Sequence, residues 1–140
     1  MTMPTAPGGF MNSKMLWVGR IMGTLVSLFL LVDGVMKLFK PLVVVNATLQ
    51  LGYAESAIVG IGATLLVCTL LYVVPRTSTV GAVLLTGYLG GAVASNVRAH
   101  MPLFNIVFPM IIAGLVWSGL WIRDVRVRNL LREQPLDRKD

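Results

Sequence analysis

Long apolar stretches separated by short polar breaks dominate this chain. Three of them contain no Asp, Glu, Lys or Arg, and they cover residues 56–75, 77–97 and 99–122. A helix needs about 20 mainly apolar residues to cross the hydrocarbon core of a membrane. The pattern therefore predicts membrane-spanning helices at residues 55–74, 79–98 and 103–122.

A fourth apolar stretch, residues 15–39, is charge-free only between Arg20 and Asp33. Lys14 and Arg20, followed by an apolar run, resemble the first two regions of a secretory signal peptide. No small-x-small cleavage site follows the run, so we expect a retained helix. Residues 1–14 are polar and rich in Pro and Gly, which predicts a flexible lead.

The distribution of basic residues orients the four predicted helices. Four crossings place both ends of the chain on one side of the membrane, and that side then holds nine of the 12 Lys and Arg residues. Cytoplasmic segments carry an excess of Lys and Arg. We therefore expect an all-α fold, an antiparallel bundle of four transmembrane helices over residues 15–122, with both termini cytoplasmic and a basic cytoplasmic tail at residues 123–140.

Composition supports a membrane location and argues against nucleic acid as a partner. Hydrophobic residues make up 56% of the chain and charged residues only 13%, whereas soluble domains have about 25% charged residues. Much of the surface must then face membrane lipids. The net charge is +6, and six of the 12 Lys and Arg residues lie in the tail, which is typical of a membrane anchor and not of a nucleic-acid interface.

Rows of small residues at every fourth position predict close helix packing. They are Gly19, Gly23 and Ser27 in the first predicted helix, and Gly87, Gly91 and Ser95 in the third. One arrangement that this pattern allows is for the two rows to face one another within one chain. Pairing of two copies through such a row, in a homo-oligomer, is the alternative.

Charged and polar residues gather near the outer ends of the predicted helices. Asp33 has Lys37 at i+4 on the same helix face, and facing rows would also place it beside Arg98. Glu55 begins the second helix at the same level. The candidate polar cluster comprises Asp33, Lys37, Glu55, Ser95, Asn96, Arg98 and His100.

Two interpretations of this cluster stay open. In the structural one, the charges cancel and fix which helices meet. In the functional one, they form an outward-facing site for a ligand head group such as a quinone or an anion, with His100 as a titratable element.

Dedicated catalytic chemistry is not evident in the residues. One His and one Cys cannot form a zinc or haem site without ligands from another chain. No nucleophile elbow or phosphate-binding loop is present. We expect no independent catalytic activity, no catalytic or metal-binding residue and no tightly bound cofactor, with a quinone as the one cofactor left open.

Several segments in consistent order resemble the DoxX-like family of small membrane proteins. They are "DGVMKLFKP", "LGYAES", "PRTSTVGAVLLTGYLGGAVASNVRAHMPLF" and "WSGLWIRDVRVRNLL". The resemblance implies a four-helix protein, mostly bacterial, in a family named after a subunit of a thiosulfate:quinone oxidoreductase. Relatives often carry an acid where this chain has Gly62-Ala63-Thr64, and Thr-His in place of Ser95-Asn96, so the resemblance implies architecture more firmly than chemistry.

Three functions follow from these observations. The first is an accessory or scaffold protein of the bacterial inner membrane, associated with membrane-bound, quinone-linked redox proteins. The second is a quinone-interacting oxidoreductase subunit. The third is a small proton-coupled exporter, against which the Asp33–Lys37 spacing and the strong charge bias argue.

Overall fold

The regular structure of this chain is entirely helical. The computed structural model describes residues 13–131, and all of the elements in that range are α-helices. They are α1 (Ser13–Phe39), α2 (Leu42–Gln50), α3 (Ala57–Val73), α4 (Ser78–Arg98), α5 (Leu103–Arg123) and α6 (Val125–Leu131). The predicted all-α class is confirmed. Most of the predicted lead and the last part of the predicted tail lie outside the described residues.

Three of these helices are long and apolar enough to cross a membrane. They are α1, α4 and α5, with 27, 21 and 21 residues. Helix α3 is also apolar but has only 17 residues, because residues 55 and 56 lie in a turn and the helix ends at Val73, whereas the sequence predicted a helix over residues 55–74. Helix α2 occupies the connection after Pro41, and α6 occupies the start of the predicted tail.

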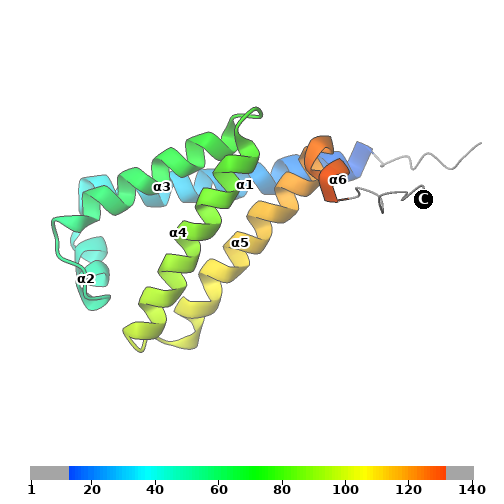
Figure 1. Cartoon of the computed structure of the whole chain (residues 1–140). Coiled ribbons are helices and arrows are strands. Elements are labelled where there is room, and N and C mark those ends of the chain that lie inside the picture. The colour runs from blue at the N-terminus through cyan, green and yellow to red at the C-terminus, as the bar shows by residue number, and fades with distance from the viewer. Residues whose placement is uncertain (1–12, 132–140) are drawn as a thin grey trace, which may run out of the picture.

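The four long helices pack as two arms. Helix α1 packs against α3 and α5, and α4 packs against the same two helices, so α1 and α4 lie diagonally opposite one another. Figure 1 shows the α1–α3 pair and the α4–α5 pair meeting near the α3–α4 turn and diverging toward the other end, where α2 lies. The divergence leaves space between the arms.

Close backbone contact holds the arms together where they meet. A Cβ on Gly119 of α5 would lie 3.3 Å from the backbone of Gly23 in α1, and a Cβ on Gly81 of α4 would collide with the backbone of Tyr72 in α3. The fully buried Tyr72 side chain donates a hydrogen bond to the Val116 carbonyl at 2.9 Å. Small residues thus allow the approach that stabilises membrane helices in lipid.

The two small-residue rows do not face one another in the structure. The row on α1 meets α5 at Gly19 and Gly23, while Gly34 of α1 meets Gly62 of α3. A Cβ on Gly87 or Gly91 of α4 would meet no neighbour within 4 Å. A row of small residues shows that a helix can be approached closely, but it does not identify the partner.

Candidate functional site

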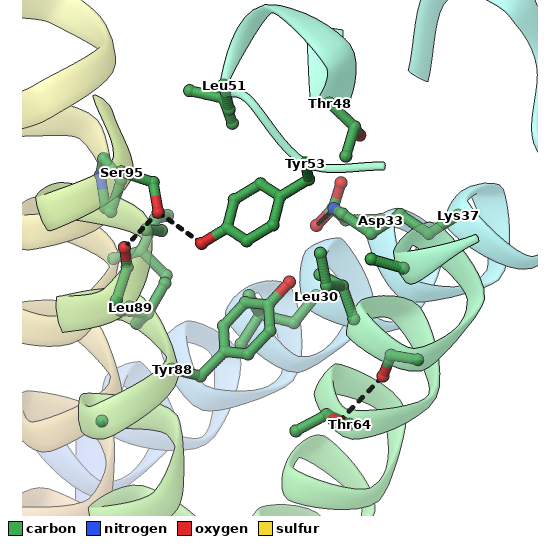
Figure 2. A pocket seen from close by; sticks show the side chains of 18 of the residues that line it. Leu30, Asp33, Lys37, Thr48, Leu51, Tyr53, Thr64, Tyr88, Leu89 and Ser95 are labelled. Carbon is green, nitrogen blue, oxygen red and sulfur yellow. Dashed lines mark hydrogen bonds and ion pairs between the residues drawn. The ribbon is translucent and has the colours of Figure 1, made fainter. Parts of the chain in front are cut away.

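A cavity of about 680 Å³ occupies the space between the diverging arms. Side chains from α1, α3, α4 and α5 form most of its wall, and the residues around the end of α2 border it on one side (Figure 2). Sites for small organic ligands and cofactors have volumes of about 300–1,000 Å³. Most of the lining is apolar and includes Phe29, Leu30, Ile61, Leu89, Phe108 and Ile112.

Three glycines line the cavity, so part of its wall consists of backbone atoms alone. Gly60 of α3, with Gly87 and Gly91 of α4, line the cavity, and a Cβ on any of them would meet nothing within 4 Å. The glycine row of α4 therefore borders open space instead of packing against a helix. Larger side chains at these positions would occupy volume now available to a ligand.

Asp33 and Lys37 form the charged part of the lining. The Lys37 ammonium pairs with the Asp33 carboxylate one turn earlier on α1. The Lys37 side chain is 18% exposed and that of Asp33 is 40% exposed. The pair is neutral as a whole, yet it presents both a cation and an anion to the cavity (Figure 2).

A hydroxyl pair closes the side of the cavity between α4 and the loop after α2. The Tyr53 and Ser95 hydroxyl oxygens are 2.6 Å apart, and the Ser95 hydroxyl donates to the Gly91 carbonyl at 2.9 Å. Because serine has a single hydroxyl proton, Tyr53 is the donor to Ser95. The loop is therefore fastened to α4 by a directed hydrogen bond.

Arg98 connects the same loop to α4 by a second hydrogen bond. Its guanidinium donates to the Leu51 carbonyl at 2.8 Å and lies 6.0 Å from the centre of the Tyr53 ring. The loop starts at Gly52, whose φ of +82° suits the left-handed end of α2. Arg98 thus acts on the loop that borders the cavity and not on the cavity itself.

Tyr88 is the polar side chain of α4 that reaches furthest into the cavity. Figure 2 shows its ring lying across the space, with the hydroxyl directed toward Leu30 and with no hydrogen bond drawn to it. A phenolic hydroxyl in an apolar cavity is available to donate to a ligand oxygen. Tyr88 therefore offers the cavity a neutral donor.

The structure brings only three of the predicted cluster residues to the cavity. Asp33, Lys37 and Ser95 line it. The Glu55 carboxylate lies 3.6 Å from the Lys40 ammonium in a separate, partly exposed ion pair. Asp33 does not lie between Lys37 and Arg98, because the rows on α1 and α4 do not face one another and the two helices stand on opposite sides of the cavity.

Asn96 and His100 also lie apart from the cavity. The Asn96 amide donates to the Ala92 carbonyl at 2.9 Å, within its own helix. His100 is exposed in the turn after α4, where its φ is +52°. Neither residue lines the cavity.

Sequence reasoning missed Thr48, Tyr53 and Tyr88 as lining residues. The available signal was a tyrosine inside or beside an otherwise apolar helix, since a buried phenol needs a partner or a polar surrounding. No group of three His, Cys, Asp or Glu residues between positions 13 and 131 is placed to hold a metal ion. Cys68 lies in the apolar core.

Apolar helices of membrane-spanning length, arranged around a cavity with a polar edge, define a helical membrane protein. Within that class, residues 21–119 match the model of the DoxX-like family, and the chain belongs to this family. The resemblance that the sequence motifs indicated is confirmed. The match covers the whole set of cavity-lining residues, from Phe29 to Ile112. No curated protein and no solved structure matches the chain.

Proposed function

We propose that this protein crosses the bacterial inner membrane four times, with α1, α3, α4 and α5 antiparallel and both termini cytoplasmic. The length and apolarity of three helices support this topology, and α3 is an apolar helix of 17 residues beside them. The excess of Lys and Arg toward the two ends of the chain supports the orientation.

Its proposed role is that of an accessory component that holds a quinone in the cavity, next to quinone-linked redox enzymes. The observation that carries this proposal is the cavity itself: about 680 Å³, mainly apolar, with polar groups on one side. An isoprenoid quinone has the matching division into an apolar tail and a ring with two carbonyl acceptors. Apolar pockets with a few placed polar groups are the usual form of such sites.

The lining supplies suitable contacts for the head group. The Tyr88 hydroxyl and the Lys37 ammonium can donate to the ring carbonyls. Phe29 and Phe108, whose ring centres are 5.7 Å apart in an edge-to-face arrangement, offer aromatic surface to the ring. The protein in this role binds and positions the quinone, and electron transfer requires a redox partner.

The geometry favours this role over proton-coupled export. A transport carboxylate has to exchange protons with the substrate, whereas Asp33 is engaged by Lys37 on its own helix. The remaining alternative is a scaffold whose cavity is filled by membrane lipid. The quinone-binding role and the scaffold role differ in the molecule that the purified protein retains, which is quinone in the first and membrane lipid in the second.

Quinone retention by cavity variants tests the proposal. We expect the purified protein to retain quinone from its membranes and to bind a short-chain ubiquinone analogue in detergent. Gly91→Leu should fill the cavity, and crowding of about 1–3 kcal/mol corresponds to roughly 5-fold to 150-fold weaker binding. Gly90→Leu is the matched control, because Gly90 is also open but does not line the cavity.

Two outcomes contradict the proposal. One is a wild-type protein that neither retains quinone nor binds the analogue. The other is an equal loss of binding in the Gly90 and Gly91 variants, since the cavity would then have no special part in binding. Retained phospholipid without quinone supports the scaffold alternative.

A further inference from the structure

A second, smaller cavity lies in the half of the fold where the two arms meet. Its volume is about 210 Å³, and it shares no lining residue with the larger cavity. Residues of α1 form most of it, with Val73 at the end of α3 and Arg123 at the end of α5. The lining residues are Gly23, Thr24, Ser27, Leu28, Leu31, Val73 and Arg123.

Arg123 brings a positive charge to this cavity and is held there by Tyr72. Its Nη2 donates to the Tyr72 carbonyl at 2.9 Å, and its guanidinium carbon lies 5.0 Å from the centre of the Tyr72 ring. Its Nη1 lies 4.0 Å from the position of a Cβ on Gly23, so the other side of the guanidinium faces α1. The side chain is therefore fixed between three helices.

The charge of Arg123 has no carboxylate partner in the part of the chain that the structure describes. The ion pairs found there join Lys37 to Asp33 and Lys40 to Glu55. A guanidinium carries several N–H donors in a planar fork, and the hydrogen bond to Tyr72 uses one of them. The free donors suit a bidentate anion such as a phosphate group.

The rest of the cavity is suited to a hydrocarbon chain. Leu28, Leu31 and Val73 give it apolar surface. The hydroxyls of Thr24 and Ser27 donate to the carbonyls of Arg20 and Gly23 at 2.8 and 2.7 Å, so their hydrogen-bonding capacity as donors is used within α1. A cation at one end and apolar surface along α1 complement an amphiphile with an anionic head.

We propose that this cavity binds one anionic phospholipid, with its phosphate on Arg123 and an acyl chain against Leu28 and Leu31. Arg20 on α1 follows Gly19, which packs on Ile122 next to Arg123, and Arg76 belongs to the α3–α4 turn at the end where the arms meet (Figure 1). Both add to the attraction for anionic lipid. Membrane attraction by a basic tail is diffuse, whereas this site takes one lipid in a defined place. Free phosphate would gain the contact with Arg123 but none of the apolar contacts.

Native mass spectrometry of the full chain in detergent tests the site, with phosphatidylglycerol and phosphatidylcholine of identical acyl chains. We expect one phosphatidylglycerol to be retained in preference to phosphatidylcholine. Arg123→Gln should weaken retention roughly 10-fold to 150-fold, the equivalent of about 1.5–3 kcal/mol for hydrogen bonds to a charged group. Arg126→Gln is the matched control, because Arg126 is exposed and lies outside the cavity.

A second pair of variants leaves Arg123 in place, in case Arg123→Gln does not fold. Thr24→Phe should fill the cavity and remove the bound lipid, whereas Leu25→Phe adds bulk to the exposed face of the same helix and should retain it. Equal retention of the two lipids, equal losses in the Arg123 and Arg126 variants, or full retention in Thr24→Phe would overturn the proposal. So would displacement of the lipid by inorganic phosphate at millimolar concentration.

Discussion

The hydroxyl of Tyr53 lies 2.6 Å from the hydroxyl of Ser95, although 42 residues separate the two in the chain. This contact joins the loop after α2 to the C-terminal half of α4. It lies on the side of the larger cavity where the arms have diverged. Arg98 reinforces it through the Leu51 carbonyl at 2.8 Å. The position of the loop therefore depends on α4 as well as on the chain that precedes it.

Removal of either hydroxyl should destabilise the protein through the same contact. We expect Tyr53→Phe to lower the free energy of unfolding by about 0.5–1.5 kcal/mol, and Ser95→Ala by a similar amount. The double variant should lower the free energy of unfolding by less than the sum of the two single variants. The difference should be a coupling energy of about 0.6 kcal/mol, which is typical of hydrogen bonds between membrane helices. Thermal or denaturant unfolding in detergent measures all three variants.

Ser118→Ala provides the control for this cycle. Its hydroxyl donates to the Gly114 carbonyl at 2.7 Å within α5, as Ser95 donates within α4, but it is exposed and remote in sequence from Tyr53. It should show no coupling to Tyr53→Phe. Strict additivity of the Tyr53 and Ser95 variants would show that the contact contributes nothing to stability.

Neutralising Asp33 alone should leave the Lys37 ammonium without its partner in a partly buried position. We expect Asp33→Asn to lower the free energy of unfolding by about 1 kcal/mol, because both side chains retain some exposure and the charge is partly screened. The folded yield from membranes should fall with it. Size-exclusion recovery and unfolding in detergent provide the measurements.

The charge-swapped variant, Asp33→Lys with Lys37→Asp, separates the two interpretations of the pair. Under the structural interpretation it recovers part of the loss, since the opposite charges still meet at i+4. Recovery of folding together with loss of quinone binding would assign the pair to the ligand site. If the single and the swapped variants are equally unstable, the ion pair is not what Asp33 contributes.

His100 should be replaceable by glycine with a gain in stability. Its φ of +52° lies in the left-handed region, where a side chain costs about 1 kcal/mol and glycine does not. We expect His100→Gly to raise the free energy of unfolding by roughly 0.5 kcal/mol or more, measured by unfolding in detergent. Quinone binding should stay unchanged, because His100 does not line the cavity.

The opposite result for His100 would restore the titratable role that the sequence suggested. Loss of quinone binding in His100→Gly, with folding intact, would place this residue in the ligand site. Lys40→Gly is a useful comparison: Lys40 also has a positive φ, of +48°, but it pairs with Glu55 at 3.6 Å. The increase in the free energy of unfolding should be smaller for Lys40→Gly than for His100→Gly.

The helices could be predicted from the sequence because apolar length and charge-free runs are local properties. Residues 79–98 and 103–122 were predicted as helices and match α4 and α5 within a residue or two. The shortening of α3 could not be foreseen, since Glu55 and Ser56 are compatible with a first helical turn. They lie in a turn in the structure, directly after a loop whose Tyr53 is hydrogen-bonded to Ser95 of α4.

The cavity could be predicted only in part because it depends on which helices pack together. Asp33 and Lys37 were identifiable as charges inside an apolar helix, and both line the cavity. The small-residue row of α4 could have faced α1, another helix or a second copy of the chain, yet Gly87 and Gly91 border open space. Nothing local to either helix specifies that α1 packs on α3 and α5 and leaves α4 on the opposite side.

In the proposed topology with four membrane-spanning helices, the 17 residues of α3 have a consequence for the bilayer around it. At 1.5 Å per residue the helix is about 26 Å long, a few ångströms less than the ~30 Å thickness of a typical hydrocarbon core. Lipid beside a short helix thins locally, and its head groups and water move inward. Since α3 forms one wall of the larger cavity, this hydrophobic mismatch brings the aqueous boundary toward Asp33 and Lys37 and lowers the energetic penalty of keeping their charges there.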